Sequence, residues 1–594
     1  MTNIIPRRRR IVRPLFWSDG LKRSTMEPST APGRMGCLLR RPAEKRMGGE
    51  RRSERRSKMN RCVSMSRRGF LAFGGAAAAA LATGSLTGCA PSMLQEGGSA
   101  EGSGGATSDV AVWAGGKVSA TELEASAVEG EPIVDFVEEL SFDVVVVGAG
   151  TAGLPAALAA HEAGASVAVL QKEASPVAQG MLAARVVKDR STEAGMTAYL
   201  HELHELNAHR PRIDLLRAYV ERSQEALEWY ESKLAAAGFD ACEESDSKDH
   251  VYADGNCYVQ GLLFSDSMQA PTTALAEQAA NDGVEFFYET PAVQLVTEGG
   301  SIVGVVGRTD DGEYKKFLAS KGVVLATGDY QNNEAMVERY VPDAQDFGRK
   351  QINKTGDGHL MGLMAGAVME PGSPSKMIHG GKGCFREEPF LALNLNGERF
   401  MYEDVPYGDR NTILRDQPEH RMVTLFDANY ADQVYGWGSD PTVPTVANGT
   451  PEKIAAFVED GTLLAADSIE ELAQTVGLPV EATVASVRRY NELCAKGEDL
   501  DFGKASKYLR PVDTPPFYAM PREYAVSAIL GGLLVNADGQ CLNEEGEPIK
   551  GLYAAGNCSG PFYGRYDYSL STMGLSVGRC ITCGYLAGRA VAGA

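Results

Sequence analysis

A run of four valines, Val144 to Val147, leads directly into a glycine-rich turn, and this junction restricts the possible folds more than any other segment. An uninterrupted apolar run is typical of a strand buried on both faces of a parallel sheet. The glycines that follow, Gly148, Gly150 and Gly153, have the G-x-G-x-x-G spacing, and the next stretch is alanine-rich. The junction therefore predicts the strand–turn–helix unit of a nucleotide-binding α/β fold.

Each glycine of this turn meets a separate physical need. Gly148 permits the tight turn, Gly150 lets backbone N–H groups approach a pyrophosphate, and Gly153 lets the helix pack close to the strand. Thr151 and Ala152 complete the turn. We expect all five residues to contact the cofactor, because the positive end of the helix faces its phosphates.

The second strand of this unit is Ala165 to Leu170, and it ends without the acidic residue expected to hold an adenosine ribose. Gln171 occupies that position and Lys172 follows it. A glutamine amide can still hydrogen-bond a ribose hydroxyl without the help of charge, so we assign both residues to the cofactor. The missing acid disfavours NAD and leaves FAD open. An α/β domain that binds no nucleotide is the alternative.

The first 58 residues differ in composition from the rest of the chain. They hold 17 Lys and Arg residues against 5 acidic residues, include the run Arg7 to Arg10, and have no apolar periodicity. An RNA-binding arm is one interpretation. We favour the other, an extension created by a start codon placed too early, with translation beginning at Met59 or Met65.

Residues 59–88 have the features of an export signal. Ser66 to Leu71 match the twin-arginine signature, and the apolar run that follows is too short to cross a bilayer as a helix. Leu-Thr-Gly-Cys then forms a lipoprotein box in which Cys89 would be acylated. We therefore expect export by the twin-arginine route and a lipid anchor on Cys89, which holds the protein at the outer face of the cytoplasmic membrane. Residues 89–140 would be tether and lead-in, and an ordinary cleavage site is the alternative.

The charge of the exported part disfavours one class of partner. Residues 1–88 carry 20 of the 58 Lys and Arg residues but 5 of the 78 acidic residues, so residues 89–594 have a formal net charge of −35. A surface this acidic argues against nucleic acid and is compatible with a basic electron-transfer protein such as a haem protein.

About 500 residues are too many for one hydrophobic core, so we expect more than one domain. Buried-strand and amphipathic-helix patterns fill residues 141–369, which we predict to be the first part of a Rossmann-type domain. Residues 370–511 change to turns, prolines and scattered helices, typical of an inserted α+β capping domain. Strand patterns return in 512–594, where the chain completes the first domain. The predicted fold class is α/β.

Five ordered motifs together resemble the flavoprotein family of soluble fumarate reductases, urocanate reductases and 3-ketosteroid dehydrogenases. They are the glycine turn, Ala326-Thr327-Gly328, Thr355 to Gly358 with Asp357, Asn396 to Phe400 with Glu403, and Gly551 to Gly556 followed by Asn557. The resemblance covers residues 142–594 and implies FAD in a two-part Rossmann-type domain, with a cap that closes substrate over the flavin. It also implies cofactor contacts from Ala326, Thr327, Gly328, Asp357, Gly556 and Asn557.

The chemistry that the resemblance implies is hydride transfer between flavin N5 and a carbon–carbon double bond, with a protein group supplying the proton. Urocanate-type members often carry an extra FMN domain. The segment between Cys89 and Phe142 is too short for one, so the electrons must come from a separate cytochrome or quinol system.

The sequence departs from the family where fumarate reductases bind their substrate. No histidine stands just before Gly531 and Gly532, and no arginine follows the pair Phe426 and Asp427 within a few residues. Fumarate is therefore disfavoured as the substrate. Tyr430 is a candidate proton donor, because a phenol near a flavin can protonate an enolate-like carbon if its pKa is lowered. A half-buried cap tyrosine is the alternative.

The last loop, Phe562 to Ser569, is longer than the arginine-containing dicarboxylate loop of the family and holds three tyrosines. Tyr568 and Arg565 in this loop suit a larger, aromatic or polycyclic substrate, held by stacking with one anionic or carbonyl anchor. Packing at the domain interface is the alternative. His379 falls near a substrate-contacting histidine of the family, and a plain turn residue is the other interpretation.

Three charged residues near the fourth motif, Arg399, Glu403 and Arg410, are candidates for a proton relay like the arginine–glutamate pair of the family. A solvated ion pair is the alternative.

The final helix is predicted to begin near Leu575. We expect Leu575, Ser576 and Val577 to place backbone N–H groups near flavin O2. Cys580 and Cys583 form a C-x-x-C pair inside this helix, which we interpret mostly as packing, with a redox or cluster role as the alternative.

Together these features predict an exported, lipid-anchored FAD enzyme that reduces an activated C=C bond of a small organic acceptor, with electrons from an external respiratory donor. The acceptor is not expected to be fumarate. The alternatives are a 3-ketosteroid-type dehydrogenase, which introduces a C=C bond, and a non-catalytic flavoprotein that transfers electrons.

Overall fold

The computed structural model describes residues 112–113, 116–117 and 132–594, except for 240–242, 246, 265–266, 381–388, 438–448 and 569–571. The basic extension, the export signal and Cys89 lie outside the described residues. In the described part of the chain, no helix is both long and apolar enough to span a membrane.

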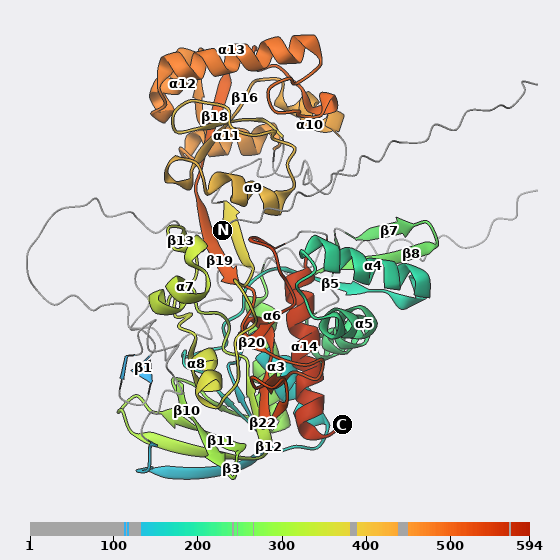
Figure 1. Ribbon diagram of the computed structural model, residues 1–594, viewed down its shortest axis with the longest axis vertical. Helices are drawn as coiled ribbons and strands as arrows, with labels where there is room; N and C mark the ends of the chain where they lie inside the picture. Colours follow the sequence, from blue (N-terminus) through green and yellow to red (C-terminus); the bar gives the residue numbers. More distant parts are fainter. Residues whose placement is uncertain are drawn as a thin grey trace, which may run out of the picture. The chain divides into compact units, whose positions relative to one another are not determined.

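An eight-stranded sheet carries the predicted nucleotide site (Figure 1). Its strands run in the order β10-β11-β12-β3-β4-β9, and β22 pairs with β12 and with β21. The bounds are β3 Glu138–Val147, β4 Val167–Leu170, β9 Glu285–Phe287, β10 Ala292–Glu298, β11 Ser301–Arg308, β12 Tyr314–Leu325, β21 Gln540–Leu542 and β22 Pro548–Ala554. β3 is parallel to both β12 and β4, as the predicted α/β class requires.

The four valines of β3 are buried on both faces of this sheet, which explains their uninterrupted run. Val144 and Val146 pack in one core with alanines of helix α3 (Gly153–Glu162) and residues of helix α14 (Leu575–Ala592). Val145 and Val147 enter a separate core with residues of the neighbouring strands.

Helix α14 packs directly on α3. A Cβ atom at Gly584 would overlap the carbonyl oxygen of Ala152, and one at Gly588 would overlap that of Ala156. The final helix therefore needs glycine at these two positions to approach the helix that follows the glycine turn.

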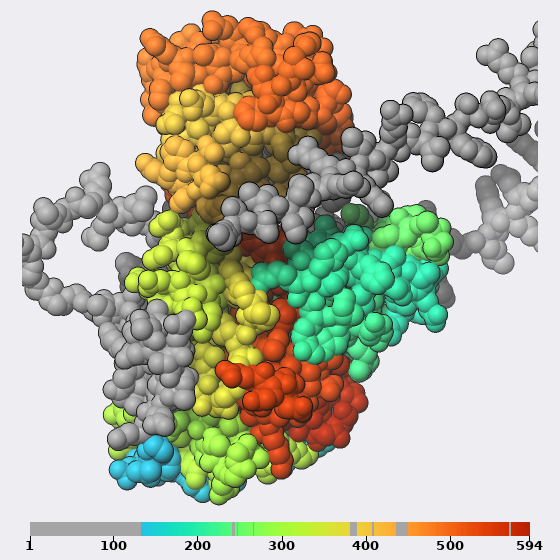
Figure 2. Space-filling model, in the orientation of Figure 1, coloured from blue at the N-terminus to red at the C-terminus, as the bar shows by residue number. Residues whose placement is uncertain are grey.

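A second, antiparallel sheet joins β5 (Leu182–Val186), β8 (Gly255–Leu263), β6 (Glu243–Glu244) and β7 (Lys248–Tyr252), with helices α4 (Glu193–Leu206) and α5 (Ile213–Ala236) against it. Helix α4 and the β7–β8 hairpin lie at the molecular surface (teal to green in Figure 2). Further helices of this part are α6 (Gln269–Asp282), α7 (Glu334–Tyr340) and α8 (Asp357–Met364).

The cap contains a four-stranded antiparallel sheet in the order β15-β16-β18-β17. Its strands are β15 Leu391–Asn394, β16 Met422–Phe426, β17 Leu464–Ala466 and β18 Phe517–Arg522. Helices α9 (Tyr407–Leu414), α10 (Tyr430–Trp437), α11 (Pro451–Glu459), α12 (Ile469–Val476) and α13 (Val480–Lys496) complete it. Because β18 pairs with both β16 and β17, this sheet extends past residue 511, where we placed the end of the cap.

Three further strands connect the cap to the rest of the chain. β14 (Lys376–Gly380) pairs antiparallel with β19 (Tyr524–Ile529), and β13 (Gly348–Arg349) pairs with the same strand. Beyond it, β20 (Leu533–Leu534) pairs with β23 (Ser559–Gly560).

Candidate active site

The predicted cofactor residues meet at one edge of the eight-stranded sheet. Val147 pairs with Leu170 of β4 and with Leu325 of β12, and Leu325 also pairs with Ala554 of β22. The segments after these strands therefore start side by side. They hold the glycine turn, Gln171 and Lys172, Ala326 to Gly328, and Gly556 with Asn557. Ligands of open α/β sheets bind at this carboxyl edge.

The glycine turn has the geometry that a diphosphate requires. Gly148 has a φ of 107°, and a Cβ on it would overlap the carbonyl oxygen of Ala326. The α3 N-cap, Ala152, makes no side-chain cap, and the first turn of the helix holds no acid. The start of this helix, next to Thr151, therefore presents its positive end to an anion without a competing acidic side chain, which fits the diphosphate of FAD.

Gln171 contacts the glycine turn, and Lys172 contacts the start of α8. The Gln171 side chain is buried and accepts a hydrogen bond from the amide of Ala149 at 3.3 Å. The Lys172 ammonium lies 2.8 Å from a carboxylate oxygen of Asp357, at the start of α8, and 2.8 Å from the Thr355 hydroxyl. The structure thus joins two predicted cofactor residues, Lys172 and Asp357, that are 185 positions apart.

The second half of the site is built by the start of α14. Gly574, with a φ of 83°, is the N-cap, and neither a side-chain cap nor an acidic residue covers the first turn. Val577 lies against Gly180, and Ser576 neighbours the buried hydroxyl of Tyr563. Leu575 packs with the last loop, so the amides of this turn fit the electron-rich edge of a flavin.

Arg579, one helical turn further along α14, is buried and fixes the segment after β22. It donates to the carbonyl oxygen of Ser559 at 2.5 Å and lies 3.5 Å from the side-chain oxygen of Asn557. The amide of Gly556 lies 3.1 Å from the sulfur of Cys583. Gly556 and Asn557 are therefore held against α14.

Two more of the predicted cofactor residues contact α8 and its approach. The Thr327 side chain lies against Gly358, where a Cβ atom would overlap its hydroxyl. Gly328 has a φ of 80° and packs against the side chain of Lys354. The motif Ala326 to Gly328 thus lies next to the motif Thr355 to Gly358.

The last loop brings Tyr568 and His379 together. The Tyr568 hydroxyl lies 3.1 Å from Nε2 of His379, and the two rings are stacked with centroids 5.7 Å apart. Tyr568 is buried, and its amide donates to the carbonyl oxygen of Lys376 at 2.9 Å. Strand β14 therefore fixes both the ring and the backbone of this tyrosine.

Asp567, the residue before Tyr568, joins the same loop to β14 and α9 through hydrogen bonds. Its carboxylate accepts hydrogen bonds from the Ile378 amide at 3.3 Å and from the side-chain amide of Asn411. Burial raises the pKa of Asp567 well above its ordinary value. Burial also lowers the pKa of Lys376, although Asp343, 2.5 Å from its ammonium, opposes the shift. Sequence reasoning missed all of these residues, because no motif marks them.

Arg565 does not enter this buried region. Its side chain is 42% exposed and lies 3.2 Å from the carboxylate of Asp409. Its side chain pairs with the start of α9, whereas the side chain of Tyr568, with which we grouped it, is buried against His379.

Arg399 and Glu403 form an ion pair in a buried charge cluster, and the solvated alternative is wrong. Arg399 donates to both carboxylate oxygens of Glu403, at 2.8 and 2.9 Å, and to those of Asp499 at 3.0 and 2.7 Å. Lys504 adds a second cation, 3.3 Å from Glu403. All four side chains are at most 6% exposed. Hydrogen bonds from Arg399 and the Lys504 amide outweigh burial and lower the pKa of Asp499 to about 2.

Arg410 is also buried but donates to the backbone carbonyl of Glu403 at 3.2 Å. Arg399 and Glu403 are four positions apart and could be paired from the sequence, whereas Asp499 and Lys504 come from the segment after α13. Only the fold brings those two charges to the pair.

Tyr430 lies in a different cluster from Tyr568. Its ring packs edge-on against Phe426 and Tyr518, with centroids 5.8 and 6.0 Å apart, at the start of α10. The surroundings are aromatic and aliphatic side chains of the cap. The structure therefore does not join Tyr430 to the other candidate catalytic residues.

Two buried titratable side chains, those of His359 and Glu370, lie against Gly532 and Gly531. The sequence analysis missed both. A Cβ at Gly532 would contact the ring of His359, and one at Gly531 would contact the carboxylate of Glu370. Burial lowers the pKa of His359 to about 4. It raises the pKa of Glu370 to about 8, against the opposing charge of Arg579.

Cys580 and Cys583 lie inside α14 as free thiols. Among the described residues, no group of three or more histidine, cysteine, aspartate or glutamate side chains is arranged to hold a metal. Cys583 contacts the amide of Gly556, which agrees with the packing interpretation.

Comparisons with known proteins agree with this geometry. A family model described as FAD binding domain matches residues 143–569. Vinyl phenol reductase of Lactiplantibacillus plantarum is 28% identical over 491 residues, covering 76% of this chain and 96% of that protein. NADH:fumarate oxidoreductase of Klebsiella pneumoniae is 27% identical over 71% of this chain, which spans only 45% of that longer protein. The open conformation of a flavocytochrome c3 fumarate reductase shares the fold, with 24% identity, a TM-score of 0.60 and 80% of each chain covered.

Proposed function

The chain belongs to the FAD binding domain family of flavoproteins, and we propose that it reduces a C=C bond conjugated with an aromatic ring or a carbonyl group. It is an FAD-dependent oxidoreductase that acts on carbon–carbon bonds. When bound, FAD supplies the hydride that such a reduction needs. The chain's own residues have to hold the substrate, exclude water and deliver the proton.

The observation that carries the proposal is the pairing of Tyr568 with His379. A buried phenol that lies 3.1 Å from an imidazole nitrogen has a partner that can stabilise the phenolate by a hydrogen bond or return a proton to it. Tyr568 therefore suits the role of the acid that protonates the second carbon of the double bond. The rings of Phe562 and Tyr563 lie 5.0 Å apart and pack in the same apolar cluster as Tyr568, so the surroundings of Tyr568 are aromatic.

This chain departs from fumarate reductases at two positions that bind a dicarboxylate in that family. No histidine stands in the few residues immediately before Gly531, and Arg565 is half-exposed and paired with Asp409. The likeness to vinyl phenol reductase over 96% of that protein supports an aromatic acceptor rather than fumarate.

We further propose that the electrons come from an external donor at the outer face of the cytoplasmic membrane. The twin-arginine signature and the lipoprotein box at Cys89 support this location. The net charge of −35 for residues 89–594 favours a basic cytochrome as the immediate donor, and a quinol system could feed it.

The test uses FAD-loaded protein, reduced viologen and a panel of acceptors. 4-Vinylphenol, cinnamates and cyclic enones should oxidise the dye, and fumarate and acrylate should do so at least tenfold more slowly. Oxidation by fumarate alone would contradict the aromatic assignment, and no oxidation by any acceptor would contradict the reductase.

The reverse reaction, a dehydrogenase that inserts a C=C bond, is the second candidate, because the tyrosine-rich loop also suits a polycyclic substrate. The reduction potential of the bound flavin separates the two directions. A low potential favours substrate reduction, whereas a high potential favours oxidation.

A further inference from the structure

Helix α9 of the cap contacts three consecutive residues of the last loop. In Figure 1 this helix lies at the end of the cap that meets β19, and Leu414 of α9 packs in one core with Val526 of that strand. The three contacts join Asp409 to Arg565 at 3.2 Å, Arg415 to the ring centre of Tyr566 at 5.2 Å, and Asn411 to Asp567 by a hydrogen bond. Tyr568, the proposed proton donor, is the next residue of the loop.

Of these three contacts, the one made by Asn411 is buried. The side chains of Arg565, Asp409 and Arg415 are 42%, 38% and 40% exposed, so solvent screens their charges. Asn411 is fully buried, and Asp567 is 2% exposed. We therefore expect the amide of Asn411 to contribute most to the hold of α9 on the loop.

Asn411 bonds both segments that meet at the proposed proton donor. Its amide nitrogen donates to the backbone carbonyl of Ile378 at 3.0 Å as well as to the carboxylate of Asp567. Ile378 directly precedes His379 in β14, and Asp567 directly precedes Tyr568. The amide thus ties together the two positions before the pair whose side chains lie 3.1 Å apart.

The carboxylate of Asp567 completes this link. The oxygen that does not face Asn411 accepts hydrogen bonds from the amides of Ile378 at 3.3 Å and Tyr568 at 2.8 Å. Burial raises the pKa of Asp567, and the charge of Lys376 on β14 opposes that shift. The carboxylate therefore joins the loop backbone to the strand backbone, and Asn411 fixes the carboxylate.

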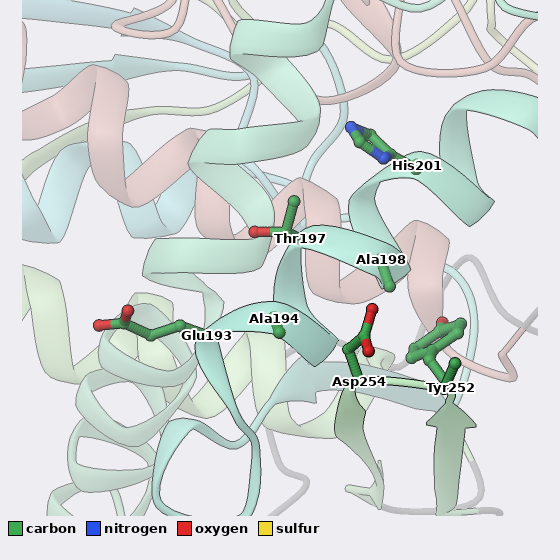
Figure 3. Close-up of a pocket in the computed structure, with 8 residues that line it drawn as sticks. Glu193, Ala194, Thr197, Ala198, His201, Tyr252 and Asp254 are labelled. Atoms are coloured by element: carbon green, nitrogen blue, oxygen red, sulfur yellow. The ribbon is translucent and has the colours of Figure 1, made fainter.

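The front of the same loop is held by a part of the molecule outside the cap. Helix α4 lines an open pocket of about 610 Å³ beside the β7–β8 hairpin, with Thr197 and His201 on the helix side (Figure 3). The connection after this helix supplies Arg210, which donates to the carbonyl oxygen of Gly564 at 3.0 Å. The loop thus runs from an anchor outside the cap, at Gly564, to an anchor on the cap, at Asp567.

We propose that Asn411 is a positioning residue that couples the docking of α9 to the placement of Tyr568 against His379. The inference rests on the proposed function, in which Tyr568 is the proton donor. Removal of the amide leaves the anchor at Gly564 intact and takes away the cap's hold on Asp567. A misplacement of about 1 Å at a reacting group can cost about 10²-fold in rate.

Asn411→Leu keeps the approximate shape of the side chain and removes the hydrogen-bond donor. We expect kcat with reduced viologen to fall by about 10–100-fold, with FAD content unchanged, because the phenol is displaced. The same substitution in a Tyr568→Phe background decides the cause. Once the phenol hydroxyl is gone, Asn411→Leu should cost less than about a further threefold, because both changes act through one group. An equal loss in both backgrounds would overturn the proposal.

Asn411→Asp carries the test if the leucine variant does not fold. It places a second carboxylate against Asp567, and two carboxylates that share a site retain a proton to a higher pH than one alone. At low pH that proton replaces the lost N–H donor, so kcat relative to wild type should fall as the pH rises from about 5 to 9. The charges of Lys376 and Asp343 are the same in both proteins and cancel in this ratio. A ratio that does not change with pH would overturn the proposal.

A second readout needs no turnover. In FAD-loaded protein labelled with ¹⁵N on its histidines, the ring signals of His379, identified by their loss in His379→Gln, report the hydrogen bond with Tyr568. They should move in Asn411→Leu in the same direction as in Tyr568→Phe. Signals that stay in place in Asn411→Leu would overturn the proposal.

Two controls separate a specific role from general loosening. Asn491→Leu removes a similar amide from α13 of the cap, where it bonds the backbone of Val512 at 2.8 and 2.9 Å. His201→Asn changes the pocket on α4. Both should leave kcat within about twofold and the His379 signals in place, because distant sites act independently. Movement of those signals in Asn491→Leu would show that any loosening of the cap displaces Tyr568, and would overturn the specific role of Asn411.

The outcomes separate the two proposals. Wild-type protein that reduces no acceptor would overturn the proposed function. The His379 signals would then still decide whether Asn411 positions Tyr568.

Discussion

The hydroxyl of Tyr568 and Nε2 of His379 lie 3.1 Å apart, although 189 positions separate the two residues in the sequence. Strand β14 supplies the histidine, and the loop before α14 supplies the tyrosine. Asp567 and the Lys376 carbonyl fix the loop on that strand. A stacked imidazole therefore orients the phenol that we propose as the proton donor.

Tyr568→Phe should keep the ring stacked on His379 and remove the hydroxyl group that we propose as the proton donor. We expect kcat to fall by 10²–10⁴-fold, the range for general acid catalysis, with FAD content unchanged. Tyr430→Phe is the matched control, because its ring lies in the cap cluster with Phe426 and Tyr518 and should leave kcat within about twofold. Steady-state rates with reduced viologen measure both. If kcat fell in Tyr430→Phe and not in Tyr568→Phe, the proton donor would be Tyr430 instead.

Gly153→Ala should abolish FAD binding. The added methyl group would overlap the carbonyl oxygen of Gly148, so α3 would move away from the turn. Gly348→Ala is the control, since its Cβ would meet only the Ala525 side chain at 3.5 Å, an ordinary contact. Visible absorption after reconstitution with FAD checks both variants, and full flavin content in Gly153→Ala would contradict the assigned turn.

Asp499→Asn should destabilise the cap by about 3–5 kcal/mol, because it removes one partner from a buried ion pair. The control is Glu498→Gln, a surface residue 3.7 Å from Lys496, for which we expect a change below about 1 kcal/mol. Urea unfolding at pH 7 measures both.

The acid dependence of this cluster has a definite sign. The pKa of Asp499 is lowered to about 2 in the folded protein, below its ordinary value of 3.8. Its contribution is therefore fully present above about pH 4 and is lost as the pH falls towards 2. Asp499→Asn should remove that part of the acid-induced loss of stability, which urea unfolding between pH 2.5 and 5 would detect.

Glu370 should change stability with pH in the opposite direction to Asp499, and Glu370→Gln should remove that change. Burial raises the pKa of Glu370 to about 8, so the folded state holds a proton that the unfolded state releases near pH 4.5. The wild-type protein should lose up to about 1.4 kcal/mol per pH unit from this group between pH 5 and 8. Glutamine should reduce the pH dependence of the free energy of unfolding. An unchanged pH dependence would contradict a protonated Glu370 in the folded state.

Local patterns were enough to predict the nucleotide-binding half. The valine run, the glycine spacing and the alanine-rich helix depend on neighbouring residues, and each formed as expected in β3, the turn and α3. Arg399 and Glu403 could be paired for the same reason, since they are four positions apart.

The rest of the site depends on contacts between distant segments. Asp499 and Lys504 join Arg399 only through the fold of the cap, and His359 and Glu370 become notable only because they are buried. A sequence pattern carries no information on such burial. The ion pair between Arg565 and Asp409 likewise could not be read from the sequence, since Asp409 comes from the distant helix α9.

The close packing of Gly584 and Gly588 on α3 has a consequence for biosynthesis. Helix α3, which follows the glycine turn, is covered by α14, so its alanine face cannot complete its packing before translation has reached residue 592. A chain truncated before α14 would leave the alanine face of α3 uncovered.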